Sequence, residues 1–150
     1  MVIIVDTREH EGKFGHITRY FDKIGVAWER GKLDFGDYAI KGYEKKAVIE
    51  RKASLDELAG NFTKGRERFK REFIRASEAD AKVVLMIERC SGYEDIMAHK
   101  YRSRFLPTSY YASLKSWEEK YGLEISFISR PTCSSGKFIY DKLKELNGFE

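Results

Sequence analysis

The sequence contains few of the residues that mark disordered, disulfide-rich or zinc-binding proteins. Only two of its 150 residues are proline, two are cysteine and three are histidine. A hydrophobic content of 42% with so little proline argues against a disordered or low-complexity chain. Cys90 and Cys133 lie far apart with no C-x-x-C pair, which favours a reducing, intracellular setting over a secreted one. No zinc site is indicated, because ligand spacing is missing around His10, His16 and His99.

Long apolar runs are also missing. No stretch approaches the roughly 20 apolar residues that cross a bilayer. The N-terminal apolar run from Val2 to Val5 is followed at once by Asp6 and Arg8, unlike a signal peptide. We therefore expect an intracellular protein that is not secreted and does not contact a membrane. Chains of this length bury about 70% of their unfolded surface around one core, so we expect one domain spanning 1–150.

The hydrophobic patterns predict an α/β fold. Short or buried strands are expected at 2–5, 26–29, 32–35, 38–40, 47–50, 83–87 and 125–128. Apolar side chains recur at helical spacing in the segments between them. Helices are expected at 17–24, from 54, at 64–79, at 107–121, and from 134 or 135 to an end at 147–148. The stretch 91–105 has the weakest pattern. This order of elements predicts a mixed central β-sheet with helices on both faces.

Positive charge is concentrated in one segment. The formal net charge is +4 and the isoelectric point is near 9.0, which favours an anionic partner such as nucleic acid. Residues 64–75 hold six basic and two acidic side chains, a surplus equal to the net charge of the whole chain. This segment is either a solvated helix face or a phosphate-binding surface. A second basic and aromatic cluster at 100–104 is either a mobile loop or another DNA contact. The candidate DNA-binding residues are Lys64, Arg66, Arg68, Lys70, Lys100, Arg102 and Arg104.

A charged triplet follows the apolar run of the predicted strand at 47–50. Residues two apart share one side of a strand, so Glu50 and Lys52 should share one face while Arg51 points to the other. Asp37 begins the neighbouring strand of an expected hairpin, and its carboxylate can therefore converge with that of Glu50. Such a pair costs desolvation and repulsion unless a ligand uses it. By itself the pattern also fits a solvated salt bridge.

A hard divalent cation such as Mg²⁺ would relieve this repulsion. It prefers oxygen ligands and usually takes one or two carboxylates together with waters and substrate phosphate. Such an ion can activate water for attack on a phosphodiester. Lys52 would then orient that water or neutralise the negative charge that develops. Asp6, at the end of an adjacent strand, would either complete the carboxylate cluster or only cap a turn.

Four motifs occur along the chain in one order. They read Val5-Asp6-Thr7-Arg8-Glu9, Gly36-Asp37-Tyr38, Glu50-Arg51-Lys52 and then Asp56. In these motifs the sequence resembles the XPF-type structure-specific endonucleases, including their archaeal helicase-associated members. Every position of that family's signature holds the expected residue, and Gly65, Arg66 and Phe69 loosely match a further helix motif. The resemblance covers essentially the whole chain and implies a restriction-endonuclease-like fold.

The resemblance also implies a function and roles for these residues. It implies Mg²⁺- or Mn²⁺-dependent hydrolysis of DNA on branched or flapped substrates, in repair, recombination or replication. Asp37 and Glu50 would be the principal metal ligands, with Asp6 nearby, and Lys52 would assist the nucleophile. Support of the site is implied for Asp6, Arg8, Glu9 and Arg51. Asp56 would either belong to the site or only favour the positive end of its helix.

Partners follow from the same resemblance. Family members that cut branched DNA usually carry tandem helix-hairpin-helix modules and pair as dimers, and 1–150 contains no such module. We expect DNA as a partner, a homodimer or heteromeric contact, and no small-molecule cofactor beyond the metal. The apolar stripe of Tyr110, Leu114, Trp117 and Tyr121 fits either core or a dimer contact, and the final helix is the other place where a dimer contact is expected. The alternative function is a catalytically silent DNA-binding or dimerisation scaffold of the same fold, and the presence of Asp37, Glu50 and Lys52 favours the nuclease.

Overall fold

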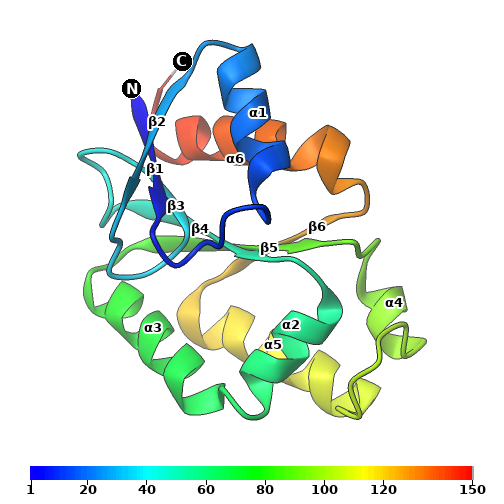
Figure 1. Cartoon of the computed structure of the whole chain (residues 1–150). Coiled ribbons are helices and arrows are strands. Elements are labelled where there is room, and N and C mark those ends of the chain that lie inside the picture. The colour runs from blue at the N-terminus through cyan, green and yellow to red at the C-terminus, as the bar shows by residue number, and fades with distance from the viewer. Residues whose placement is uncertain (150) are drawn as a thin grey trace.

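The computed structural model describes residues 1–149 as a six-stranded sheet between two layers of helices (Figure 1). The strands are β1 (Val2–Asp6), β2 (Ala27–Gly31), β3 (Tyr38–Ile40), β4 (Ala47–Lys52), β5 (Lys82–Glu88) and β6 (Glu124–Ile128). The helices are α1 (Gly15–Lys23), α2 (Leu55–Phe62), α3 (Arg66–Glu78), α4 (Tyr93–Met97), α5 (Pro107–Tyr121) and α6 (Pro131–Leu146). Within this part of the chain no helix is both long enough and apolar enough to cross a membrane.

The sheet is mixed, as the order of elements predicts. Its strand order is β2-β1-β3-β4-β5-β6. The antiparallel hairpin of β3 and β4 lies near the middle, with Tyr38 opposite Ile49. β1 pairs antiparallel with β3 and parallel with β2, whereas β4, β5 and β6 are parallel to one another. The central position of the hairpin buries all six residues of β4, including its charged end.

Each face of the sheet has its own apolar core. Helices α1 and α6 cover one face, where Ile49 and Met86 of the strands belong to the same buried cluster as Phe21 and Ile139 (Figure 1). Helices α2, α3 and α5 cover the other face. Since side chains alternate along a strand, β4 directs Ile49 and Arg51 toward α1 and α6, and its even-numbered residues toward α2 and α3.

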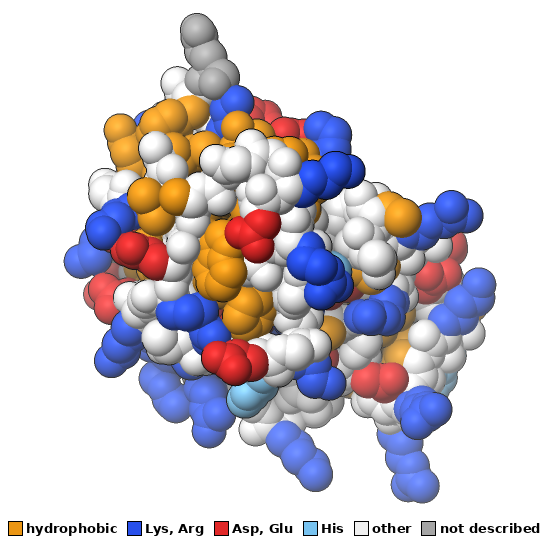
Figure 2. All heavy atoms as spheres, turned by 45° about the horizontal axis from the view of Figure 1, so that its top comes forward, with side chains coloured by type: hydrophobic (Ala, Val, Ile, Leu, Met, Phe, Trp, Pro, Cys, Tyr) orange, Lys and Arg blue, Asp and Glu red, His pale blue; other side chains and the backbone are white. Residues whose placement is uncertain are grey.

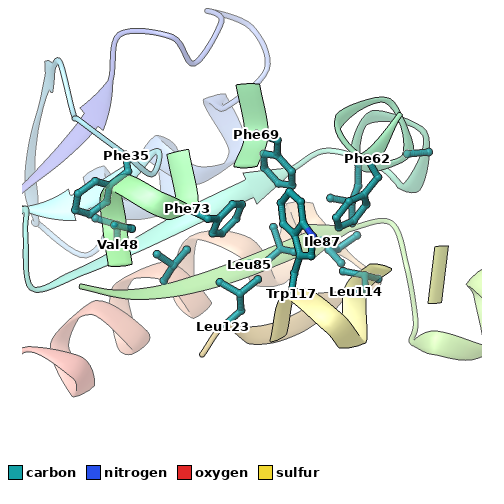
Figure 3. Packing of buried hydrophobic residues seen from close by; sticks show 14 of the residues in the cluster. Phe35, Val48, Phe62, Phe69, Phe73, Leu85, Ile87, Leu114, Trp117 and Leu123 are labelled. Atoms are coloured by element: carbon teal, nitrogen blue, oxygen red, sulfur yellow. The ribbon is translucent and has the colours of Figure 1, made fainter. Parts of the chain in front are cut away.

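An aromatic cluster fills the core under α2, α3 and α5. The rings of Phe62 and Phe69 lie 4.9 Å and 5.3 Å from that of Trp117, and Phe73 lies beside them (Figure 3). Tyr110, Leu114 and Trp117 are all buried there. The apolar stripe of α5 is therefore core, and these three side chains leave no free surface for a dimer contact.

Two sequence predictions about this fold are wrong in detail. No strand forms at 32–35, because the chain bends there between β2 and β3 while Leu33 and Phe35 still turn inward. The apolar alternation thus marked buried loop side chains rather than a ladder strand. The last helix begins at Pro131 instead of at the serines, since proline suits the first turn of a helix. The stretch 91–105, which had the weakest pattern, contains the short helix α4.

The surface carries basic side chains on many sides. Figure 2 shows lysine and arginine side chains projecting around the periphery of one face, with acidic side chains between them. The net charge of +4 is therefore not displayed on this face as one continuous basic patch.

Candidate active site

The β3–β4 hairpin brings Asp37 and Glu50 into one pocket. The backbone N–H of Asp37 donates to the carbonyl of Ile49 at 2.7 Å, which places Asp37 beside the charged end of β4. Gly36 has φ +79°, and a Cβ there would lie 2.5 Å from Cβ of Val48. Only glycine allows the chain to approach β4 so closely before it enters β3. Gly36 is therefore required by the turn that places the carboxylate of Asp37 beside β4.

Glu50 and Lys52 point to the same side of β4, as strand geometry predicts. The Lys52 Nζ lies 3.0 Å from Oε2 of Glu50 and 4.7 Å from the centre of the Phe69 ring. The two residues are only 4% and 7% exposed. The second carboxylate oxygen of Glu50, Oε1, is buried and has no hydrogen-bond donor within residues 1–149. An acceptor left in this way costs free energy until a cation or donor occupies it.

The pKa values of Asp37, Glu50 and Lys52 are all raised in this pocket. Burial raises the pKa of Asp37 well above its ordinary range, and the neighbouring charges of Glu50 and Glu9 raise it further. Burial also raises the pKa of Glu50 to about 7, although the Lys52 ammonium acts in the opposite direction. Burial alone would lower the pKa of Lys52, but the carboxylates of Glu50 and Asp37 outweigh it and raise that pKa. Lys52 is thus permanently positive, while the two acids resist being ionised together.

These groups fit a hard divalent cation. The donors are carboxylate oxygens, which Mg²⁺ and Mn²⁺ prefer, and Glu50 Oε1 is buried without a donor in the described chain. No three acidic, histidine or cysteine side chains in the described part of the chain are gathered closely enough to enclose an ion. That arrangement suits Mg²⁺, which keeps several waters and takes few protein ligands.

Arg51 points to the opposite side of the sheet and anchors a buried ionic network. Its Nε lies 2.7 Å from Oε2 of Glu9, and its Nη1 lies 2.7 Å from Oε1 of Glu88. The hydroxyl of Tyr38 also donates to Glu9, at 2.7 Å. The backbone N–H of Arg51 donates to Oδ2 of Asp37 at 2.8 Å. Arg51 therefore joins the network on one face to the carboxylate on the other.

Glu88 links this network to both helices of the α1–α6 layer. The hydroxyl of Ser135 donates to its Oε2 at 2.5 Å, and Nε2 of His16 lies 2.7 Å from the same oxygen. Burial alone would raise the pKa of Glu88, but these hydrogen bonds and the charge of Arg51 outweigh it and lower that pKa. Glu88 is a buried, ionised residue that the sequence motifs did not reveal.

Asp6 is not among the residues that line this pocket. Its side chain is fully buried, and Oδ1 accepts from the backbone N–H of Leu33 at 2.7 Å. Its Oδ2 accepts from the backbone N–H and the Nε of Arg8. Arg8 in turn donates to the carbonyls of Leu33 and Gly36. Asp6 and Arg8 therefore hold the bend that leads into Asp37, because its backbone groups would otherwise lack partners.

Asp56 also lies apart from the carboxylate pair. It follows the N-cap of α2, where the hydroxyl of Ser54 accepts from the backbone N–H of Glu57. Its Oδ1 accepts from the backbone N–H groups of Arg102 and Ser103 at 2.9 Å and 2.8 Å. The last residue of the four motifs therefore fastens the basic loop at 100–104 to the end of α2.

The basic residues predicted to contact DNA have different surroundings. Arg68 lines the pocket beside the carboxylates. Arg66 lies over the rings of Phe62 and Trp117, which gives it a packing role. The side chains of Lys64, Lys100, Arg102 and Arg104 are exposed and Lys70 is half-buried, with Lys100 Nζ 3.5 Å from Oδ1 of Asp95. Tyr101 packs on Tyr110 and donates to the carbonyl of Phe105, so its ring supports the loop from inside.

Helix α3 contributes an acid that sequence reasoning missed. Glu72 lines the pocket together with Asp37, Glu50 and Lys52, and its Oε1 accepts from the backbone N–H of Gly36 at 2.8 Å. Helical periodicity places Glu72 on the polar side of α3, but nothing in the sequence indicates that this side meets the hairpin.

Comparison with known proteins assigns the family. The model of the ERCC4 domain matches residues 5–140. The chain belongs to the ERCC4 domain family. This is a family of nuclease domains, and the resemblance read from the four motifs is confirmed. None of the curated proteins gives a significant match to the sequence.

Solved structures support the same ERCC4 fold. XPF from Aeropyrum pernix matches with a TM-score of 0.71 and 22% identity, over 100% of this chain and 63% of that one. The structure of that XPF in complex with DNA matches with a TM-score of 0.70 and 22% identity, over 98% of this chain and 64% of the other. The likeness confirms the predicted mixed α/β architecture. The chain spans less than two thirds of the length of these relatives.

Proposed function

We propose that this ERCC4 domain is a Mg²⁺- or Mn²⁺-dependent endonuclease that hydrolyses phosphodiester bonds in branched or flapped DNA, in repair, recombination or replication. One observation carries the proposal. Asp37 and Glu50 line the same pocket with Lys52 beside them, and Glu50 Oε1 lacks a donor within the described residues. A scaffold that only bound DNA would gain nothing from two buried acids whose pKa values are both raised.

In this proposal Asp37 and Glu50 hold the ion. When bound, the ion lowers the pKa of a water and screens the charge that builds on the phosphate. Lys52 stays protonated because its pKa is raised, so it acts as a fixed positive charge toward the phosphate rather than as a base. The backbone N–H of Arg51 keeps Asp37 turned toward the pocket.

The surrounding residues keep these groups in place. The buried pair of Arg51 and Glu9 fixes the end of β4, and Asp6 with Arg8 fixes the bend before Asp37. Preorganisation of this kind removes the cost of arranging charges during the reaction. We assign these four residues to support of the site, and we do not propose Asp6 as a metal ligand.

DNA would reach the pocket past two groups of basic side chains. Arg68 stands at the pocket and Lys64 is exposed just before α3, while the loop held by Asp56 carries Arg102 and Arg104. Lysine and arginine bind phosphates largely irrespective of base sequence, which suits an enzyme that responds to DNA structure. We further propose that 1–150 forms one nuclease domain that works with a second copy or another chain that delivers the substrate.

Nicking of a flapped DNA duplex tests the function. We expect cleavage with Mg²⁺ or Mn²⁺ and none with EDTA. Asp37→Ala and Glu50→Ala should each lower the rate by more than about 100-fold, since loss of a supporting residue alone typically costs 10- to 100-fold. Asp34→Ala is the matched control, because this acid lies close to the hairpin but its side chain is 63% exposed. Metal-independent nicking retained by both pocket variants would overturn the proposal.

A further inference from the structure

Glu72 contributes to the candidate metal pocket from a different element than Asp37 and Glu50. It lies in the middle of α3, whereas the acids of the hairpin come from β4 and from the turn before β3. One of its oxygens, Oε1, accepts from the backbone N–H of Gly36 at 2.8 Å. This hydrogen bond holds the Glu72 carboxylate at the residue that precedes Asp37. The side chain is therefore fixed at the pocket rather than free in solvent.

One of the two oxygens of the neighbouring Glu50 carboxylate has no hydrogen-bond partner in the described residues. Its Oε2 is paired with Lys52 at 3.0 Å, and its Oε1 is buried without a donor anywhere in 1–149. Glu72 lines the same pocket as Glu50. Carboxylates that share a largely buried pocket repel one another unless a proton or a cation lies between them.

The positive charges near this group are already committed elsewhere. Lys52 is paired with Glu50, and the guanidinium of Arg8 donates to Asp6 and to two backbone carbonyls. Among the described residues that line the pocket, Arg68 remains, on the same helix as Glu72 and four positions before it. Five acidic residues of the described chain line the pocket, and its lysine, Lys52, is already paired with one of them. They are Glu9, Asp37, Glu50, Glu57 and Glu72.

Direct coordination of one ion by Asp37, Glu50 and Glu72 together is not what the structure favours. Within the described chain no three such side chains are drawn together around a single point. A Mg²⁺ ion usually binds one or two carboxylates and keeps several waters. A third acid held slightly away can accept a hydrogen bond from one of those waters, and residues in that position typically change metal affinity by 10- to 100-fold.

We propose that Glu72 is a positioning residue of the metal site, which accepts a hydrogen bond from a water in the hydration shell of the ion held by Asp37 and Glu50. The inference rests on the proposed metal-dependent function. It assigns to α3, whose basic side chains are candidates for DNA binding, a part in metal binding as well. The competing explanation is that Glu72 only holds the turn at Gly36.

Calorimetric titration of the full chain with Mn²⁺, without DNA, separates the two explanations. Glu72→Gln keeps an oxygen that accepts from Gly36 but removes the charge, and we expect its Kd for Mn²⁺ to rise about 10- to 100-fold. Glu72→Asp keeps the charge on a side chain that is one methylene shorter, which moves the carboxylate away from the pocket. The Kd of this variant for Mn²⁺ should therefore also rise. Glu67→Gln is the matched control, since it removes the same charge from α3 in a shallow hollow with Lys64 and Arg71, and its Kd should not change.

The outcomes distinguish this inference from the proposed function. Wild-type affinity in both Glu72 variants would overturn the role of Glu72 and leave the metal site standing. An equal loss in Glu67→Gln and Glu72→Gln would also overturn it, because the effect would then be the net charge of the helix. Absence of Mn²⁺ binding by the wild-type protein would refute the proposed metal site itself. Thermal melting without metal shows that each variant is folded, and Glu72→Asp tests the role if Glu72→Gln melts early.

Discussion

Replacement of Glu50 by glutamine should remove a pH-dependent loss of stability from the metal-free protein. Burial raises the pKa of Glu50 from its ordinary value of 4.5 to about 7. The folded protein therefore keeps a proton on this carboxyl at pH values where the unfolded chain has already released it. The stabilisation that this proton provides is complete below about pH 4.5 and is lost as the pH rises to about 7.

The size of this effect follows from the same shift. Each pH unit between the folded and unfolded pKa corresponds to about 1.4 kcal/mol, so ionisation of Glu50 costs the folded state on the order of 3 kcal/mol. The raised pKa of Asp37 acts in the same direction. Glu88 acts in the opposite direction because its pKa is lowered, but its contribution is common to the wild type and the variant. The difference between the two proteins therefore isolates the pocket.

Urea unfolding in EDTA between pH 5 and pH 8 measures that difference. As the pH rises across this range, the free energy of unfolding of the wild type should fall relative to that of Glu50→Gln by roughly 3 kcal/mol. Mg²⁺ at pH 8 should stabilise the wild type but not the variant, since the ion replaces the proton. Parallel pH profiles for the two proteins would refute the claim that Glu50 is buried beside like charge. Glu67→Gln controls for loss of one exposed negative charge.

Three further predictions concern the surroundings of the pocket. Asp56→Ala should release the loop at 100–104. Fluorescence anisotropy should then show DNA binding weakened several-fold, while the Mn²⁺ affinity is unchanged. An equal loss of DNA affinity and Mn²⁺ affinity would place Asp56 in the metal site. Glu88→Gln should lower the free energy of unfolding in urea by about 3 kcal/mol, because a buried partner of Arg51 loses its charge. A variant as stable as the wild type would contradict this. Joint substitution of the basic side chains around the start of α3 by glutamine should reduce the salt dependence of DNA binding by close to one unit for each phosphate that is no longer neutralised, whereas an unchanged slope would show that this surface is only a solvated face. The substituted residues are Lys64, Arg66, Arg68 and Lys70.

The sequence predicted the hairpin part of the site because strand geometry is strict. Residues two apart must share a face, so Glu50 and Lys52 point together and Arg51 points away, as the structure places them. The pairing of β3 with β4 then brings Asp37 beside Glu50. Alternation along one strand and the register of one hairpin were sufficient for these conclusions.

The position of Asp6 could not be obtained in this way. Its carboxylate binds the backbone N–H of Leu33, which is free because the chain bends where a strand at 32–35 was predicted. The apolar residues of that segment are buried in either case, so their pattern cannot distinguish a strand from a bend. The sequence left open whether Asp6 completes the carboxylate cluster or caps a turn, and its hydrogen bonds to backbone N–H groups fit the second role.

Interactions between distant segments account for the rest. Glu72 meets the hairpin, and Glu88 meets His16 and Ser135, across separations of more than 30 residues in the chain. Periodicity shows which side of a helix is polar, but it does not show which groove of the sheet that side faces. Such residues become visible only when the helix has been placed on the sheet.

Diffraction from crystals soaked in Mn²⁺ tests the central claim most directly. The account predicts an anomalous peak between the carboxylates of Asp37 and Glu50, with the Lys52 ammonium beside it. A peak at another site, or none in a crystal whose pocket is open to solvent, would contradict the proposal that these two acids hold the catalytic ion.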